Sequence, residues 1–149
     1  MTSSLPTTDN PLAIGAHSVY FIDGRILVAI YRGDVAPDEI LAVISAGRLA
    51  GVGVVATITD VGEMGSFGAE TRKALVDARP LDLLEGIDAD VAVYVVNADV
   101  VRRAVMTLVS TASRLFSKRH VRMQYVKTIA QAERLARAYV AAVDAGQKP

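Results

Sequence analysis

Two short apolar runs near the start of the chain are rich in β-branched and aromatic residues. The runs are His17–Ile22 and Arg25–Tyr31, and the pair Asp23-Gly24 separates them. Residues of these kinds are enriched in strands. A two-residue Asp-Gly connection suits a type I′ turn, in which both residues need positive φ. We therefore predict a β-hairpin over these residues.

Three later runs have the composition of strands. Val52–Thr59 and Val91–Val96 are continuously apolar and rich in β-branched residues, as expected of strands buried on both faces. His120–Lys127 alternates instead, which indicates a half-buried strand. Asp60 directly follows the first of these runs, so we expect it at the end of a buried strand.

The segments between these strands carry the 3.6-residue period of helices. Pro37 suits the first turn of one helix, which should stop near Gly51. Ser66 is expected to cap the next helix, and Pro80 must end it. Asp99 should cap a long third helix.

The last helix begins with a capping box. Thr128-Ile-Ala-Gln131 has the spacing in which the two side chains bond each other's backbone N–H groups. The predicted order is therefore β-β-α-β-α-β-α-β-α. This order gives a single α/β domain with a mixed sheet of about five strands, parallel after its first strand, and about four helices.

The length of 149 residues suits one domain. Residues 1–13 are rich in Ser, Thr, Pro and Asn without any period, and we interpret them as a disordered N-terminal arm. Residues 14–146 would then form the domain, and residues 147–149 a frayed tail.

Composition narrows the functions that the domain can have. The formal net charge is zero, which argues against a nucleic-acid binder, because such a protein needs a basic face. The chain has no Cys and only two His residues without a ligand spacing, so we expect no metal and no other cofactor. With no secretory signal and no long apolar run in the sequence, we expect a cytoplasmic protein without a transmembrane segment.

Three segments of the chain are similar to one known family. Gly33-Asp-Val-Ala-Pro-Asp38 leads from the hairpin into a helix. A D-Φ-x-x-Φ-x-S-Φ-x-x-E-x-R pattern, in which Φ is apolar, runs from Asp60 to Arg72. The chain closes with VRMQYVKTIAQAERLARAYV, a strand and an alanine-rich helix. Over residues 17–143 the chain therefore resembles the STAS superfamily, the fold of bacterial anti-sigma-factor antagonists, and within it the SpoIIAA-like (STAS/SEC14-like) branch.

The resemblance implies a STAS/SpoIIAA-like domain that regulates by binding a protein partner. It also implies a candidate interaction or phosphoacceptor loop with five residues. These residues are Asp60, Gly62, Gly65, Ser66 and Phe67.

The two polar members of this loop each allow two interpretations. Ser66 is either a phosphoacceptor, whose added charge a helix N-terminus favours, or a plain N-cap. Asp60 either orients a ligand or partner at the end of its strand, or bonds nearby backbone amides. In both cases we predict the second, local role.

Three classes of function remain open at this point. No nucleophile, base and orienting group fall together, so we predict a non-catalytic regulatory or protein-interaction domain that uses the surface Asp60–Arg79. The alternative is a small apolar-ligand or lipid-binding carrier, in line with the SEC14-like branch and a mean hydropathy of +0.34. An enzyme would have to use Asp60, Ser66 and arginines on a phosphorylated substrate. The basic residues of the third helix fit either an acidic partner or a solvated face: Arg102, Arg103, Arg114, Lys118 and Arg119.

Hydrophobic residues make up 52% of this chain and its net charge is zero, so little repulsion keeps copies apart and we predict a homodimer. The first or second helix should form its interface, because several leucines fall off the inner stripes. They are Leu41, Leu49, Leu75 and Leu81.

Overall fold

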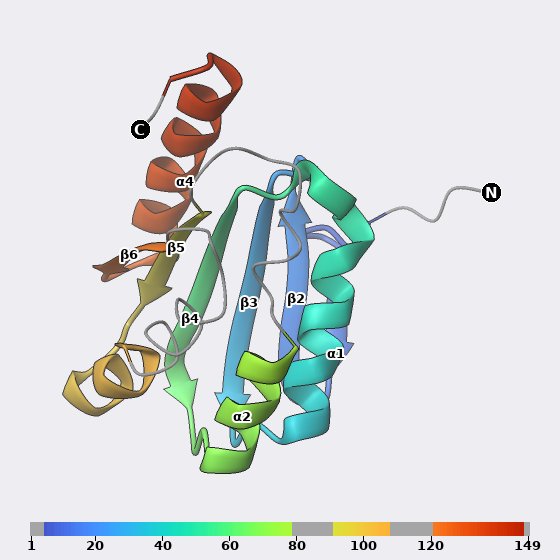
Figure 1. Ribbon diagram of the computed structural model, residues 1–149, viewed down its shortest axis with the longest axis vertical. Coiled ribbons are helices and arrows are strands. Elements are labelled where there is room, and N and C mark those ends of the chain that lie inside the picture. Colours follow the sequence, from blue (N-terminus) through green and yellow to red (C-terminus); the bar gives the residue numbers. More distant parts are fainter. Residues whose placement is uncertain (1–4, 79–90, 108–120, 148–149) are drawn as a thin grey trace.

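A computed structural model of the chain describes residues 5–78, 91–107 and 121–147. Within these residues, six strands form one mixed sheet whose spatial order follows the order along the chain (Figure 1). The strands are β1 (Leu12–Ile14), β2 (His17–Ile22), β3 (Ile26–Gly33), β4 (Ala56–Met64), β5 (Val91–Val96) and β6 (Val121–Val126). The pairs β1–β2 and β2–β3 are antiparallel, and the pairs from β3 to β6 are parallel.

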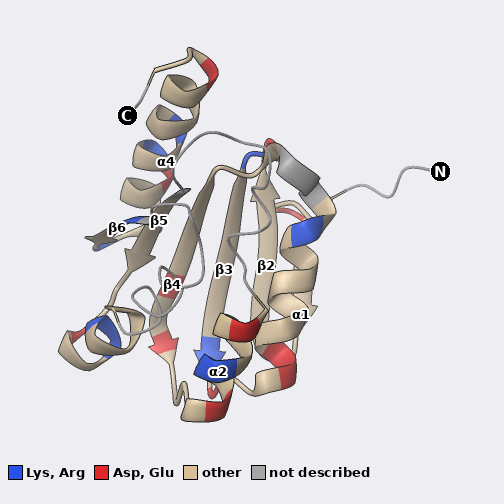
Figure 2. Cartoon of the chain, viewed as in Figure 1, with Lys and Arg blue, Asp and Glu red and all other residues tan. Residues whose placement is uncertain are grey.

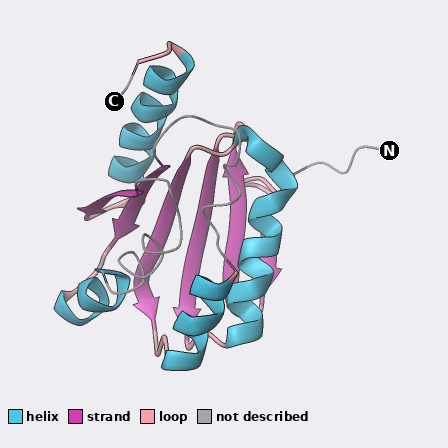
Figure 3. Ribbon diagram, viewed as in Figure 1, coloured by secondary structure: helices cyan, strands magenta, loops and turns pink. Residues whose placement is uncertain are grey.

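Helices cover both faces of the sheet (Figure 3). α1 (Pro37–Gly47) and α2 (Ala69–Asp77) lie on one face, which we call the α1 face. α4 (Ile129–Asp144) lies on the opposite face, the α4 face. Residues 100–107 are also helical, and Met106 packs into the core of the α1 face. The 3-10 helix η1 (Arg48–Gly53) follows α1 directly.

Each face of the sheet has its own hydrophobic core, because alternate residues of a strand point to opposite faces. On β2, Phe21 joins the core of the α1 face and Tyr20 joins the core of the α4 face. Ala132 and Ala136 of α4 are fully buried against the sheet. Because both faces are covered, the central strands need apolar residues at every position, as the sequence indicated.

The predicted hairpin is confirmed. β2 has the predicted bounds, and the turn residues Asp23 and Gly24 have φ of 54° and 65°. Ion pairs attach this turn to α4, where Arg137 Nη1 lies 3.0 Å from Asp23 Oδ2 and Arg25 pairs with Asp144. The hairpin end of the sheet is therefore closed by the last helix.

The sheet has six strands, one more than predicted. β1 pairs with β2 in the register Leu12↔Val19, so residues 12–14 extend the sheet at the end of the segment expected as a disordered arm. The two strands meet at the turn Gly15-Ala16, in which Gly15 has φ 59°. Three residues are too few to show a side-chain pattern, so the sequence does not reveal this strand, which main-chain hydrogen bonds hold in the sheet.

β4 begins and ends later than predicted, and Asp60 does not end it. The pairing of β3 with β4 continues past Asp60 through a register shift, as far as Gly33↔Met64. Gly62 lies so close to Asn97 that an added Cβ would be 2.9 Å from the Asn97 Cβ. The glycine makes room for a neighbour inside the strand, whereas the sequence pattern placed it in a loop.

α2 begins at Ala69, and the prediction that Ser66 caps it is wrong. The N-cap residue is Gly68, and no side chain accepts a hydrogen bond there. Both backbone polar groups of Ser66 are already bonded to residues that follow β3: its N–H to Asp34 and its C=O to Val35. These long-range contacts delay the helix beyond the serine.

Two other predicted helix starts are confirmed. Asp99 Oδ1 accepts from Arg102 N at 2.8 Å, and Thr128 Oγ1 accepts from Gln131 N at 3.1 Å. Gln131 Oε1 accepts from the N–H of Lys127. In the predicted capping box it would accept from the N–H of the N-cap residue Thr128 instead. Some predictions fall outside the described residues and concern Pro80, Leu81, Arg114, Lys118, Arg119 and His120.

Candidate functional site

The candidate loop lies where parallel strands end. β3, β4 and β5 run in the same direction, so their carboxyl ends meet at one edge of the sheet, which we call the carboxyl edge. A helix starts beyond each strand, with Ala36, Gly68 and Asp99 at the three starts. Acidic and basic residues both lie at this end of the sheet (Figure 2). In open α/β sheets, binding sites occur at the carboxyl ends of strands.

The Ser66 loop, which we define as Gly65–Gly68, is held by the segment that joins β3 to α1. Gly65 N donates to Gly33 O at 2.7 Å, and Ser66 N donates to Asp34 Oδ1 at 2.8 Å. In the opposite direction, Val35 N donates to Ser66 O at 2.9 Å. Three bonds within two consecutive residues hold this loop in one arrangement.

Two arginines bond the carbonyl groups on either side of this contact. Arg102 Nε donates to Met64 O at 3.1 Å, while its Nη1 pairs with Asp99 Oδ2 at 2.7 Å. Arg72 Nη1 donates to Phe67 O at 2.9 Å. Hydrogen bonds from charged donors are stronger than neutral ones. The loop is thus attached to α2 and to the helix at residues 100–107, as well as to the segment before α1.

Asp34 is the acidic partner of the loop. Its hydrogen bond from Ser66 N, with a smaller contribution from the Ser66 hydroxyl, lowers the pKa of Asp34 below its ordinary value. The carboxylate is therefore ionised where it meets Ser66. Any negative group added to the exposed Ser66 would come close to this charge.

Gly65 lies too close to the Asp34 segment for a larger residue. A Cβ added to Gly65 would overlap Asp34 Oδ1 and lie 2.9 Å from Asp34 N and from Gly33 C. Two of these neighbours are backbone atoms, which cannot turn aside as a flexible side chain can. The close approach of two loops explains this glycine.

Beneath the loop, two side chains join it to the core. Phe67 is buried in the core of the α1 face. Thr71 Oγ1, also buried, donates to Val35 O at 2.7 Å. The exposed part of the loop therefore rests on a fixed base.

Two large apolar side chains stand exposed at the start of the helix at residues 100–107. Val100 and Val101 are 85% and 71% exposed. The next residue, Arg102, bonds Met64 O and so places this pair next to the end of β4. Adjacent exposed apolar residues at such a position are typical of a surface that contacts another molecule.

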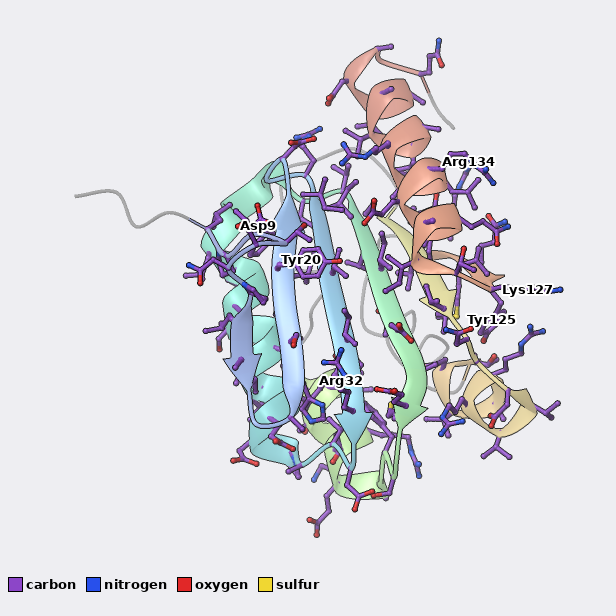
Figure 4. All side chains as sticks on the ribbon, turned by 180° about the vertical axis from the view of Figure 1, so that it is seen from behind. Asp9, Tyr20, Arg32, Tyr125, Lys127 and Arg134 are labelled. Carbon is purple, nitrogen blue, oxygen red and sulfur yellow. The ribbon has the colours of Figure 1, made fainter. Side chains whose placement is uncertain are left out.

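Within the described residues, Asp60 bonds Gly62 and no residue of the Ser66 loop. It has the strand parity of Ile58, which packs in the core of the α4 face. Its Oδ1 accepts from Gly62 N at 2.9 Å, a local bond of the kind predicted for it. On that face lies Tyr20 (Figure 4), whose pKa is raised by burial, by Glu133 and by Asp60.

The structure thus brings three of the five predicted site residues together, Gly65, Ser66 and Phe67. Sequence reasoning missed Asp34, which it treated only as part of a helix start, and it interpreted Arg102 as one of several basic surface residues. A signal for Asp34 was present, because it follows Gly33 at the end of one parallel strand, as Ser66 follows Gly65 at the end of the next.

The described residues contain no group of three or more His, Cys, Asp or Glu side chains that could hold a metal ion. Among the helices within these same ranges, none combines the length and apolar character needed to cross a membrane.

Comparison with known proteins supports the fold. No protein-family model matches the chain, and no curated protein matches it in sequence. A solved structure of the anti-sigma factor antagonist SpoIIAA in its unphosphorylated form is similar, with a TM-score of 0.55 and 15% sequence identity. The match covers 82% of this chain and 98% of that protein. The chain therefore has the SpoIIAA-like fold that the sequence motifs indicated.

Proposed function

We propose that this chain is a regulatory protein-interaction domain that acts by binding and not by catalysis. Its contact surface comprises the Ser66 loop, the first turn of α2 and the valine pair Val100 and Val101. The valine pair carries the proposal, because exposed apolar side chains are costly in water and gain by being covered. The likeness to an anti-sigma factor antagonist supports the same class of function.

Partner binding can be tested with a double substitution of the valines. The full chain is used to capture partners, captured proteins are identified by mass spectrometry, and each is then titrated directly by calorimetry. Val100→Ser with Val101→Ser should weaken the affinity about tenfold or more, since burying an exposed valine side chain contributes about 1.5 kcal/mol. Leu12→Ser is the matched control, because Leu12 is 38% exposed but lies on the edge strand β1.

An unchanged affinity in the double variant would contradict the proposed surface. Native mass spectra of the purified chain separate this function from the carrier alternative. A co-purifying apolar small molecule, without any protein that binds in calorimetry, would favour the carrier.

Ser66 is the residue through which this surface can be regulated. A phosphate there would bring about two negative charges close to the Asp34 carboxylate, and the repulsion would oppose the bond between Asp34 and Ser66 N. We expect Ser66→Asp to weaken partner binding while the fold stays intact. Ser66→Asn, of similar size to Asp but uncharged, is its control, and equal affinities would exclude a charge switch.

Self-association belongs to a different surface of the molecule. Leu41 and Leu49 are 43% and 59% exposed, whereas Leu75 packs against the core of the α1 face. We infer a homodimer interface around the outer side of α1 and η1. Sedimentation equilibrium should give a dimer for the wild type and 15.8 kDa for Leu41→Ser with Leu49→Ser.

A further inference from the structure

His17 is a buried histidine for which the proposed function has no role so far. It is the first residue of β2 and is 2% exposed, with its ring edge-on to Tyr31 at 5.5 Å between centroids. Its Nδ1 accepts from Arg32 N at 3.0 Å. Because a nitrogen that accepts carries no proton, the hydrogen of the neutral ring lies on Nε2.

The Nε2 side of the ring meets α1. Nε2 lies 3.3 Å from Glu39 Oε1, and the same oxygen accepts from Ala36 N at 2.9 Å. The bond from Ala36 N lowers the pKa of Glu39, burial opposes this, and His17 lowers it further. The other oxygen fills the space above Gly15, where a Cβ would overlap it. Both nitrogens of His17 are therefore used.

The bonds of this pair hold the two ends of one segment. Arg32 N, at its start, is bonded to His17, and Ala36 N, at its end, is bonded to Glu39. Between these two ends lie Gly33–Val35, the residues that bond the Ser66 loop. Figure 4 shows Arg32 near the end of β3, where this segment begins.

The geometry points to the His17–Glu39 pair as the element that positions the Ser66 loop through Gly33–Val35. A buried imidazole is costly unless its polar atoms are bonded, and an apolar residue would fill the same space without that cost. The polar ring is explained if the segment must be fixed at both ends. This inference deepens the proposed function and rests on it only for the effect on partner affinity.

Amide hydrogen exchange of the full chain tests the positioning without any partner. His17→Phe keeps a buried ring but removes both hydrogen bonds. Relative to the wild type, exchange at Gly65 and Ser66 should speed up about tenfold more than exchange at Val28 does. A tenfold change is the effect of about one lost hydrogen bond. The carboxyl pKa of Asp34, followed by NMR, should rise towards its ordinary value.

Two further variants separate positioning from general stability. Val19→Ala removes buried volume from the same strand, and it should speed exchange evenly without a selective change at Ser66. His17→Asn places a carbonyl oxygen near the position of Nδ1, so it should restore most of the protection. Equal effects of His17→Phe and Val19→Ala at Ser66, relative to Val28, would overturn the inference.

Glu39→Ala provides an independent test if His17→Phe does not fold. Glu39 is partly exposed, and its loss frees Ala36 N and the Nε2 side of the ring. Exchange at Ser66 should again increase selectively, and unchanged exchange would overturn the inference. If exchange responds but the valine substitutions leave partner affinity unchanged, the proposed contact surface fails while the positioning stands.

Discussion

The hairpin at one end of the sheet and the Ser66 loop at the other hold their shapes in different ways. At the hairpin, Asp23 and Gly24 adopt the φ values that the turn needs, and the adjoining residues of β2 and β3 pair directly. The Ser66 loop depends instead on Asp34, which lies 32 residues earlier, and on Arg102, which lies 38 residues after Met64. The first shape follows from neighbouring residues, whereas the second exists only in the folded sheet.

The largest effect is expected where the local shape is broken. Gly24→Val should lower the free energy of unfolding by about 2 kcal/mol, because a β-branched residue is strained at this positive φ. A Cβ at Gly24 meets only Leu5 at an ordinary 3.7 Å, so the backbone and not crowding causes the loss. Urea unfolding measures it. Gly24→Asn should cost less, and equal losses in both variants would contradict this account.

The base of the Ser66 loop should show the next largest effect. Thr71→Val keeps the shape of the side chain but leaves the Val35 carbonyl without its donor. We expect a loss of about 1–2 kcal/mol in the free energy of unfolding. Thr71→Ser, which keeps the hydroxyl, should retain more stability than Thr71→Val. The reverse order would show that the methyl group, and not the hydrogen bond, holds the base.

The comparison can be sharpened by pH, because the main-chain N–H of Ser66 is bonded to a carboxylate, whereas the strand pairing of the hairpin is not. The pKa of Asp34 is lowered in the folded chain by its bond from Ser66 N. Its stabilising contribution is therefore present above the unfolded value of about 3.9 and is lost as the pH falls through the lowered value. NMR should show the Ser66 amide shifting in this acid range, whereas the amide of Val28, in the middle of β3, should not. Asp34→Asn should abolish the shift, and its persistence would assign it to another group.

The smallest effect concerns Ser66, which the sequence analysis predicted to be a helix cap, and it is measured against Thr128, which is one. Ser66→Ala should change the free energy of unfolding by less than about 0.5 kcal/mol, because the side chain is exposed and caps nothing. Thr128→Ala should cost about 1 kcal/mol, because Thr128 does cap α4. Thermal unfolding of the two variants decides this. A greater loss of stability for Ser66→Ala than for Thr128→Ala would support the interpretation of Ser66 as the cap of α2.

The same contrast explains which features of the fold could be predicted. The hairpin turn and the caps at Asp99 and Thr128 depend on residues within a few positions of each other, and all were recognised. The buried strands were recognised because burial on both faces leaves a continuous apolar run. β1 was missed because three residues are too few for a pattern.

The candidate site was only partly predictable for a related reason. The motif from Asp60 to Arg72 identified the right stretch of chain, but not which of its residues meet. Asp60 lies inside β4, which extends four residues beyond it, and it shares the parity of Ile58 on the α4 face. The start of α2 was placed too early because the bond between Ser66 N and Asp34 joins two strand ends, and no periodicity within either segment records such a bond.

The order of the strands has a consequence for how the chain folds. Each new strand is added beside the one that precedes it in the sequence, from β1 to β6. During synthesis, each strand after β1 therefore finds a neighbour already made, and no strand must insert between two others. The parallel pairs, such as Ile26↔Ala56, join residues far apart in the sequence, so their loop-closure cost should make them form more slowly than the antiparallel hairpin. We expect folding to start at the hairpin and to proceed towards the C-terminus, with the closure of α4 over the hairpin as its last step.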